Sequence, residues 1–291
     1  MRTLFVFGLL LLGIFRASAQ VDVELSLNQE DFLPSEAIPL AAKITNRSGQ
    51  QLHLGADADW LTFNVESADG FVVLKNADVP VTGAFDLENA QLAIKRVDLQ
   101  PYFSMTKPGR YRVIATLHIK DWGAQIASAP LTLDVISGAK LWSQDFGLTD
   151  VTNAAPEVRK YTLEQANYLK EQLRLYVQVS DSAESTVYKV SALGPMVSFS
   201  HPEAQVDRQG RLNVLWQTGA QSFSYSIVNP DGTVALLDYY DNFFSRPRLA
   251  VDDSGNVVVQ GGTRRLKPTE LPIVNPPNQL PALTKPAPLP N

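Results

Sequence analysis

The side chains best suited to proton transfer or metal binding are few in this sequence. It contains three histidines, His53, His118 and His201, and no cysteine. Metal sites often use histidine pairs at close spacing, for example at positions i and i+4 of a helix, and no such pair occurs. We therefore expect structural or solvent-exposed roles for the histidines. The lack of cysteine excludes a thiol nucleophile and a thiolate metal site.

Two pairs of neighbouring acids are candidates for carboxylate chemistry. They are Asp57 with Asp59, beside Trp60, and Asp252 with Asp253. The two acids of a glycosidase can come from distant strands, so the sequence gives no separation between such groups. The nucleophile elbow, the Walker loop and the dinucleotide fingerprint are all absent. The sequence thus predicts no catalytic residue and no cofactor.

The second acid pair has two interpretations. Its carboxylates, together with Ser254 and Asn256, could supply oxygen ligands to calcium, but the acid spacing does not match the ligand pattern of an EF-hand loop. A tight turn explains the same residues with fewer assumptions. In that turn Asp252 accepts backbone N–H bonds and Gly255 supplies a positive φ. We therefore predict a structural turn here and no metal site.

An aromatic cluster is the strongest candidate for a binding site. Four aromatic residues and an arginine lie in the stretch DYYDNFFSRPR: Tyr239, Tyr240, Phe243, Phe244 and Arg246. Aromatic rings flanked by acids and arginine can stack on sugar rings or anchor a protein partner. The alternative is that these rings belong to a core. As a binding site, the cluster predicts an unidentified protein or glycan partner.

The elements that would position these residues repeat along the chain. Asp207 and Asp252 lie 45 positions apart, and Gly210 and Gly255 have the same offset. Each pair belongs to an Asp-centred turn that an alternating strand follows, in PEAQVDRQGRLNVLW and in RPRLAVDDSGNVVVQGG. A period of about 45 residues is typical of four-stranded propeller blades. We predict propeller-like repeats over residues 156–266, with starts near 156, 202 and 247.

The second turn resembles a hairpin of NHL-type and related bacterial propeller repeats. Asp252, Gly255 and Asn256 match the Asp-x-x-Gly-Asn motif, whereas the earlier copy has Arg211 in place of the asparagine. Two full units and a truncated third are too few to close a propeller, which typically needs at least four blades. The prediction is therefore an incomplete propeller. Three arrangements remain open: an open stack of sheets, a stack covered by the N-terminal domain or the tail, or a piece completed by another chain.

The segment TLEQANYLKEQL, which begins at Thr162, also allows two interpretations. A capping-box pattern and good helix propensity favour a helix. The repeat favours two strands joined by an extended hairpin, which is the interpretation we adopt.

The chain from Val21 onward has the pattern of a sheet protein. VDVELSL places Val21, Val23, Leu25 and Leu27 on one face, as expected for a half-buried strand. About seven short strands without a helical pattern predict an antiparallel sandwich over residues 20–137. The stretches ITNRSGQQLHL and MTKPGRYRVIATLHI resemble bacterial immunoglobulin-type modules. That resemblance implies roles as spacers, adhesins or proteinase binders.

The chain begins with the pattern of a cleaved export signal. A short basic start, an apolar run and the small residues Ala17, Ser18 and Ala19 predict a signal peptide over residues 1–19 and a mature start near Gln20. The apolar run is too short to span a bilayer, so we expect no membrane span after cleavage. Removing the signal changes the formal net charge from −5 to −7. That balance argues against nucleic-acid binding.

Together these features predict an exported all-β protein in several parts. After the sandwich we expect a linker over residues 138–155, the repeats, and a proline-rich disordered tail over residues 267–291. Its compartment would be periplasmic, cell-surface or extracellular. The predicted function is non-catalytic binding or scaffolding, with oligomerisation possible. The alternatives are a glycan- or peptide-acting enzyme or accessory module, and a proteinase inhibitor that acts through a sandwich loop.

Overall fold

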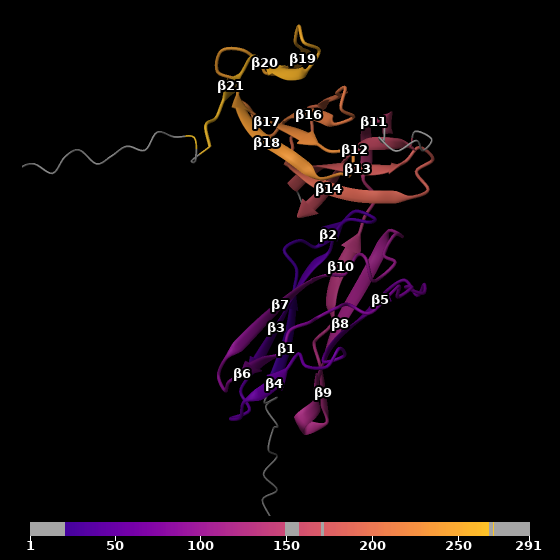
Figure 1. The fold of residues 1–291 in the computed structure, drawn as a ribbon, viewed down its shortest axis with the longest axis vertical. Coiled ribbons are helices and arrows are strands. Elements are labelled where there is room, and N and C mark those ends of the chain that lie inside the picture. The colour runs from indigo at the N-terminus through magenta and orange to yellow at the C-terminus, as the bar shows by residue number, and fades with distance from the viewer. Residues whose placement is uncertain (1–20, 149–156, 170–171, 268–269, 271–291) are drawn as a thin grey trace, which may run out of the picture.

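The computed structural model describes residues 21–148, 157–169, 172–267 and 270. These residues form an all-β molecule, which confirms the predicted fold class at that level. Figure 1 shows two parts stacked end to end, with residues 21–137 in the lower part and the later strands in the upper part. The expected signal peptide and nearly all of the expected tail lie outside the described residues.

The lower part consists of two main sheets and a small strand pair. One sheet has the order β1-β3-β7, the second has the order β2-β10-β8-β5 with β9 added to β8, and β4 pairs with β6. A short 3-10 helix, η1 (Lys120–Trp122), connects β8 to β9. The strands are β1 (Val21–Ser26), β2 (Asp31–Phe32), β3 (Pro39–Asn46), β4 (Leu52–Leu54), β5 (Leu61–Ser67), β6 (Phe85–Leu87), β7 (Leu92–Asp98), β8 (Gly109–Ile119), β9 (Ala124–Ala127) and β10 (Leu131–Val135).

One hydrophobic core joins the two main sheets of the lower part. Strand β8 alternates strictly, because every second side chain from Tyr111 to Ile119 is buried. Successive residues of a strand point to opposite faces, so this alternation places one whole face of β8 in the core. Val21 and Val23 of β1 are buried in the same way from the other sheet.

The upper part consists of three antiparallel sheets that pack on one another. A four-stranded sheet has the order β11-β12-β13-β14, the next has the order β15-β16-β17-β18-β21, and β19 and β20 form a two-stranded hairpin. No sheet among the described residues closes into a propeller, and the arrangement is an open stack. The strands are β11 (Ala139–Leu148), β12 (Glu157–Leu169), β13 (Gln172–Asp181), β14 (Val187–Pro195), β15 (Glu203–Val206), β16 (Leu212–Gln217), β17 (Ser222–Val228), β18 (Val234–Asp241), β19 (Arg248–Val251), β20 (Val257–Gln260) and β21 (Thr263–Arg264).

Strand β11 lies where we predicted a linker, and it adds a strand before the predicted start of the first repeat. Residues 139–148 form a complete edge strand, and β11 pairs with β12 from Ala139↔Gln165 to Leu148↔Glu157. The first sheet therefore begins well before residue 156. The strand resembled a linker because most of its side chains are exposed, including the polar run Ser143–Asp145.

The segment that allowed a helix forms strands. β12 and β13 run antiparallel and pair from Arg159↔Asp181 onward, as the repeat predicted. Their outward positions accept the polar residues that gave the segment its helix propensity, because tertiary packing overrides propensity.

The internal repeat is visible in the strands. β15 and β19 lie 45 residues apart, and so do the starts of β16 and β20. The first two sheets each contain a four-stranded meander, whereas the third unit has two strands in the described part of the chain. After Gly261 and Gly262, both at positive φ, the chain returns to the second sheet and pairs β21 with the edge of β18.

A small hydrophobic cluster connects the two parts of the molecule. Leu33 of the lower part packs with Tyr176 and Val190 of the first upper sheet. Beside them the buried Glu36 accepts hydrogen bonds from the backbone N–H of Leu33 at 2.8 Å and from Gln29 Nε2 at 3.0 Å. Burial raises the pKa of Glu36 despite these bonds. The two parts therefore meet in a packed junction.

Within the described residues, no helix has both the length and the apolar character needed to cross a membrane.

Candidate functional site

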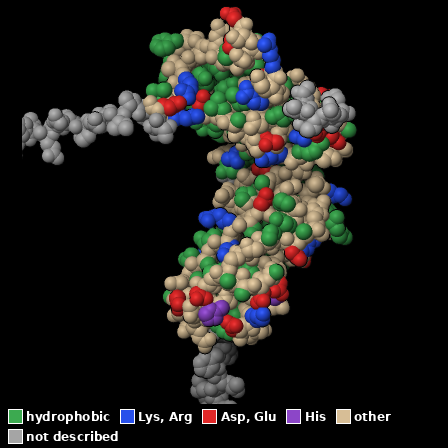
Figure 2. All heavy atoms as spheres, in the orientation of Figure 1, with side chains coloured by type: hydrophobic (Ala, Val, Ile, Leu, Met, Phe, Trp, Pro, Cys, Tyr) green, Lys and Arg blue, Asp and Glu red, His purple; other side chains and the backbone are tan. Residues whose placement is uncertain are grey.

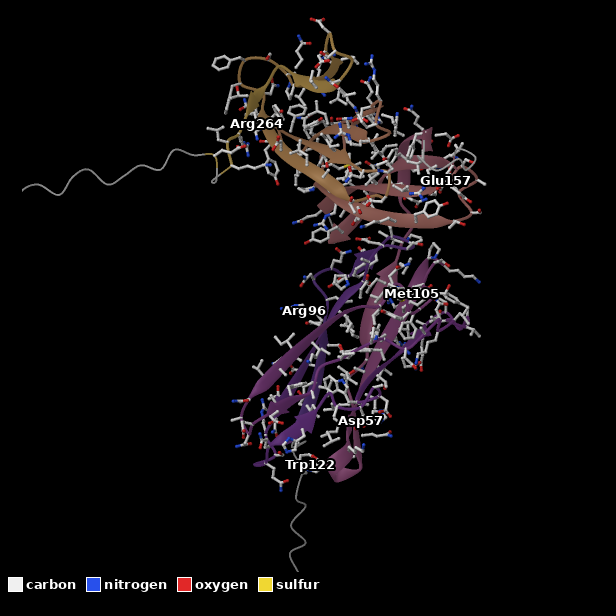
Figure 3. All side chains as sticks on the ribbon, in the orientation of Figure 1. Asp57, Arg96, Met105, Trp122, Glu157 and Arg264 are labelled. Carbon is white, nitrogen blue, oxygen red and sulfur yellow. The ribbon has the colours of Figure 1, made fainter. Side chains whose placement is uncertain are left out.

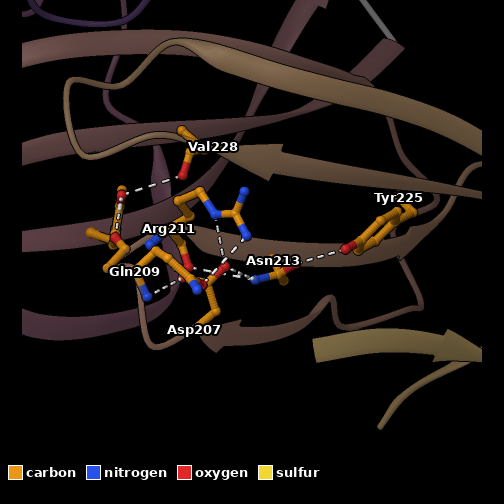
Figure 4. Close-up of polar contacts among 8 residues, drawn as sticks. Asp207, Gln209, Arg211, Asn213, Tyr225 and Val228 are labelled. Carbon is orange, nitrogen blue, oxygen red and sulfur yellow. Dashed lines mark hydrogen bonds and ion pairs between the residues drawn. The ribbon is translucent and has the colours of Figure 1, made fainter. Parts of the chain in front are cut away.

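The first Asp-centred turn is the centre of a buried polar network (Figure 4). The Asp207 carboxylate accepts hydrogen bonds from the backbone N–H groups of Gln209 and Arg211, both at 2.9 Å, and from Arg211 Nε at 2.9 Å. The Asp207 side chain is only 4% exposed. Gly210 has a φ of +74°, which closes the turn between β15 and β16.

The network continues into the neighbouring strands. Asn213 lies beside Asp207 and accepts a hydrogen bond from the Tyr225 hydroxyl at 2.6 Å. From the first upper sheet, the Tyr161 hydroxyl donates to the carbonyl oxygens of Gly210 at 3.0 Å and Val228 at 3.3 Å. These contacts hold the turn against the preceding sheet. They give the turn a structural role.

The second Asp-centred turn has the same geometry at an exposed position. Asp252 accepts hydrogen bonds from the Asn256 backbone N–H at 2.8 Å and from Asn256 Nδ2 at 3.2 Å. These donors lower the pKa of Asp252. Gly255 has a φ of +78°. Arg208 joins the two turns by donating from Nη1 to the Ser254 carbonyl oxygen at 3.1 Å.

The five aromatic and arginine candidates do not form one site. Tyr240 points toward the hairpin and packs edge to face with Tyr225, with ring centroids 6.5 Å apart. Arg246 lies over the Phe223 ring, 5.3 Å from its centroid. Tyr239 points to the opposite face of β18, because successive residues of a strand alternate. It is 44% exposed.

Phe243 and Phe244 are presented to solvent in the loop between β18 and β19. Their exposed fractions are 63% and 94%. The Gly262 N–H donates to the backbone oxygen of Ser245 at 3.0 Å and to its Oγ at 3.1 Å, which ties the loop to the end of β20. We call residues 242–247 the aromatic loop. It lies at the free end of the sheet stack.

The last full sheet has a partly uncovered apolar face beside this loop. Leu249 of β19 and Val259 of β20 pack on it, and together they cover the side nearest β15 and β16. Ile227, Leu236 and Tyr240, on β17 and β18, remain partly exposed. We call these three residues the outer face. Figure 2 shows hydrophobic side chains gathered beneath the hairpin, with charged side chains around them.

A buried charge interrupts the outer face, because Asp238 lies between Leu236 and Tyr240 on the same side of β18. The buried Asp238 pairs with Arg264 Nε at 3.1 Å and with Lys267 Nζ at 2.8 Å. Burial opposes ionisation of Asp238, but these two cations hold its pKa below the usual range. Asp241, the last residue of β18, pairs with Arg265. Figure 3 shows Arg264 at this edge of the upper part. The salt bridges fix the end of the described chain on β18.

A second feature lies at the opposite end of the molecule, where Figure 3 labels Asp57. A cleft of about 380 Å³ is lined by Asp57, Asp59, Trp60, His118 and Lys120, among others. It brings together one of the acid pairs and one of the histidines that the sequence singled out. The Trp60 ring is buried and donates from Nε1 to the Val81 carbonyl oxygen at 2.7 Å.

Sequence reasoning did not identify Lys120 in this cleft. Lys120 Nζ pairs with Asp57 Oδ1 at 2.9 Å across the cleft. The signal was weak because 63 positions separate the two residues. His53 lies elsewhere and pairs with Asp86 at 2.6 Å, and His201 is exposed before β15. No group of three or more His, Cys, Asp or Glu side chains that could hold a metal ion occurs in the described ranges.

Comparisons with known proteins place this chain in no family. No family model matches it, and no curated protein matches it. Among solved structures, it is similar to Spo0M, a sporulation control protein from Bacillus subtilis, with a TM-score of 0.31 and 10% identity. The likeness covers 58% of this chain and 82% of the other. At that score it carries no argument about fold or function.

Proposed function

We propose that this protein is an exported, non-catalytic binding or scaffolding protein, and that the aromatic loop contacts a protein partner. The observation that carries the proposal is the exposure of two adjacent phenylalanines, Phe243 at 63% and Phe244 at 94%. Large aromatic side chains dominate the binding energy of protein interfaces. A tethered loop can present them with less loss of conformational entropy on binding.

A protein partner fits these side chains better than a glycan does. Phenylalanine has no polar group, and sugar recognition needs hydrogen bonds as well as stacking. In the described part of the chain, Arg246 points back onto Phe223 and Tyr240 packs inward. The loop therefore offers apolar area, which suits a complementary apolar pocket.

The proposed architecture is an immunoglobulin-like sandwich followed by an incomplete propeller-like stack. In the lower part, the Tyr111 hydroxyl donates to the Lys107 carbonyl oxygen at 2.7 Å. A tyrosine that bonds to the backbone a few residues upstream is a feature of immunoglobulin-type domains. In the upper part, two four-stranded meanders and the 45-residue offset support propeller-like units. Both kinds of module commonly serve as binding scaffolds.

The test is affinity capture from an envelope extract of the source organism, with the mature chain as bait. Replacing both Phe243 and Phe244 with serine removes the exposed aromatic area and leaves the strands unchanged. We expect at least a tenfold loss of the specifically retained protein, because central aromatic anchors each contribute about 2 kcal/mol or more.

A matched control uses another exposed phenylalanine. Phe199 is 77% exposed and lies between β14 and β15, away from the aromatic loop in sequence. Phe199→Ser is expected to retain the partner at the wild-type level. Equal capture by the wild type and the double variant would contradict the proposal. Binding to a glycan array that the double variant abolishes would replace the protein partner with a glycan.

The cleft at the other end supports a second candidate function. Two carboxylates, Asp57 and Asp59, share it with His118, which is a composition suited to acid–base chemistry on a glycan or peptide. Because the proposed function is non-catalytic, we expect neither the wild type nor Asp59→Asn to turn over a glycoside or peptide panel. Hydrolysis of a glycoside or peptide panel by the wild type that Asp59→Asn abolishes would establish the enzyme instead.

A further inference from the structure

The junction between the two parts of the molecule is small. The described chain crosses from the lower to the upper part once, between β10 and β11. Figure 1 shows the parts meeting where β2 lies beneath β13 and β14. A few apolar side chains fill this contact: Leu33, Ile136, Ala166, Tyr176, Val187 and Val190. Domains that share a small interface usually move relative to one another, so the junction has the features of a hinge.

A buried carboxyl group lies in this junction. Glu36 is 7% exposed, and its backbone pairs with Val190 of β14 in an isolated bridge. The Glu36 N–H donates to the Leu33 carbonyl oxygen at 3.1 Å, and the Glu36 carboxyl accepts from the Leu33 N–H at 2.8 Å. Glu36 therefore closes the turn that presents Leu33 to the upper part, and its own side chain is buried beside that contact.

Neither group that donates to the Glu36 carboxyl carries a charge. The donors are the Leu33 backbone and Gln29 Nε2. Burial of a carboxylate without a paired cation is costly, because the ion loses its hydration. Opening the junction removes the cover that β13 and β14 provide and returns the carboxyl to water. Ionisation of Glu36 thus favours the open junction, and protonation favours the closed one.

Other ionisable groups lie on the strands packed at the junction. The charge of Arg174 on β13 favours ionised Glu36, but burial has the larger effect and raises the pKa of Glu36. The Arg174 guanidinium lies over the Tyr168 ring, 3.5 Å from its centroid, and its Nε is buried with no hydrogen-bond partner among the described residues. Burial also raises the pKa of the Tyr176 hydroxyl on β13 and of Asp31 on β2.

Glu164 of β12 is a second carboxyl near the junction. It lies opposite Tyr176 in the strand register. Burial raises its pKa, and Lys140 partly offsets that effect. Its neighbour is the segment that connects the two parts, because a Cβ placed on Gly138 would lie 2.5 Å from Glu164 Oε2. Glu164 therefore contacts the connection, whereas Glu36 belongs to the turn that the upper part covers.

We propose that the junction is a pH-sensitive hinge, which is closed when Glu36 is protonated and loosens when Glu36 ionises. The closed junction raises the pKa of this carboxyl above its ordinary value of 4.5. The stabilisation is therefore complete below that value and is lost as the pH rises through the raised pKa. The inference goes beyond the proposed function, because the aromatic loop takes no part in it.

The test measures the distance between the two parts as a function of pH. The chain has no cysteine, so Thr132→Cys on β10 and Asp253→Cys at the free end of the stack, both exposed positions, accept one pair of dyes. Single-molecule energy transfer then reports the closed and open populations. We expect the equilibrium constant for closing to be at least about threefold smaller at about pH 7.5 than at about pH 4.5.

Three variants of the labelled chain identify the group responsible. Glu36→Gln keeps the size of the side chain and an acceptor oxygen, and it should stay closed at both pH values. Glu30→Gln removes an exposed carboxylate just before β2 and should keep the wild-type transition. Leu33→Ala weakens the apolar cluster without changing a titratable group, so it should open the junction at both pH values.

Three results would overturn the inference. The first is a distance that does not change with pH in the wild type, and the second is a transition that Glu36→Gln retains. The third is a transition that Glu164→Gln or Asp31→Asn abolishes while Glu36→Gln does not. Every variant keeps Phe243 and Phe244, so failure of the hinge and failure of the partner proposal remain distinguishable.

Discussion

Replacing Asp207 with alanine is expected to lower the free energy of unfolding of the upper part by about 3 kcal/mol. The Asp207 carboxylate accepts three hydrogen bonds from Gln209 and Arg211 within the turn. Hydrogen bonds to a charged acceptor contribute about 1.5–3 kcal/mol, and the loss removes the partner of one exposed and one part-buried backbone N–H. Arg211 remains able to reach water, because its side chain is 40% exposed, so the cost stays below that of a fully buried ion pair. Chemical denaturation followed by fluorescence measures the change.

The repeat supplies the control for this prediction. Asp252 occupies the same turn position 45 residues later and makes the corresponding bonds to Asn256. That turn is exposed, so water can replace the carboxylate. Asp252→Ala is therefore expected to destabilise the protein clearly less than Asp207→Ala. Equal losses for the two variants would contradict the role that we assign to burial.

Replacing Tyr161 with alanine is expected to cost about 4 kcal/mol, the second large effect. The Tyr161 ring is fully buried and stacks on Phe146 with centroids 4.1 Å apart. Truncating a large buried aromatic residue to alanine typically costs 3–5 kcal/mol, because it removes buried area and leaves a cavity. Thermal and chemical unfolding both report the change.

Phenylalanine at this position separates packing from hydrogen bonding. Tyr161→Phe keeps the ring and removes the hydroxyl, which bonds to the carbonyl oxygens of Gly210 and Val228 in the next sheet. We expect a loss of about 1–2 kcal/mol, the usual cost of an unsatisfied buried group. If Tyr161→Phe destabilised the protein as much as Tyr161→Ala, the ring packing would not be the main contribution of this residue.

Local patterns were sufficient to predict many of the strands and the geometry of the Asp-centred turns. Alternation in VDVELSL follows directly from the two-residue period of a strand, and Val21 and Val23 are buried. Glycine in an Asp-centred turn indicates a positive φ, and Gly210 and Gly255 have φ values of +74° and +78°. These features depend on a few neighbouring residues, so the sequence contains them.

Features that depend on which face is covered could not be predicted. Tyr239 and Tyr240 are adjacent and chemically alike, yet one points away from the hairpin and the other packs beneath it. Sequence patterns place them on opposite faces but do not say which face a third sheet will cover. Strand β11 was missed for a related reason, because an edge strand exposed to solvent has the composition of a linker. The partner of Asp57 in the cleft is equally non-local.

The proposed binding surface lies at the free end of the sheet stack. Within the described residues the last hairpin ends with β20, and β21 then pairs with the edge of β18. This leaves the aromatic loop exposed. In the proposed function, this exposed loop is the binding surface.

The mass of the mature chain in solution tests this account most directly. Light scattering on residues 20–291, over a hundredfold range of concentration, measures whether copies of the chain associate. We predict a monomer at every concentration, because in this account the aromatic loop binds a different protein. A stable oligomer that Leu236→Asp or Phe244→Ser dissociates would contradict the account, because a second copy would then occupy the open end.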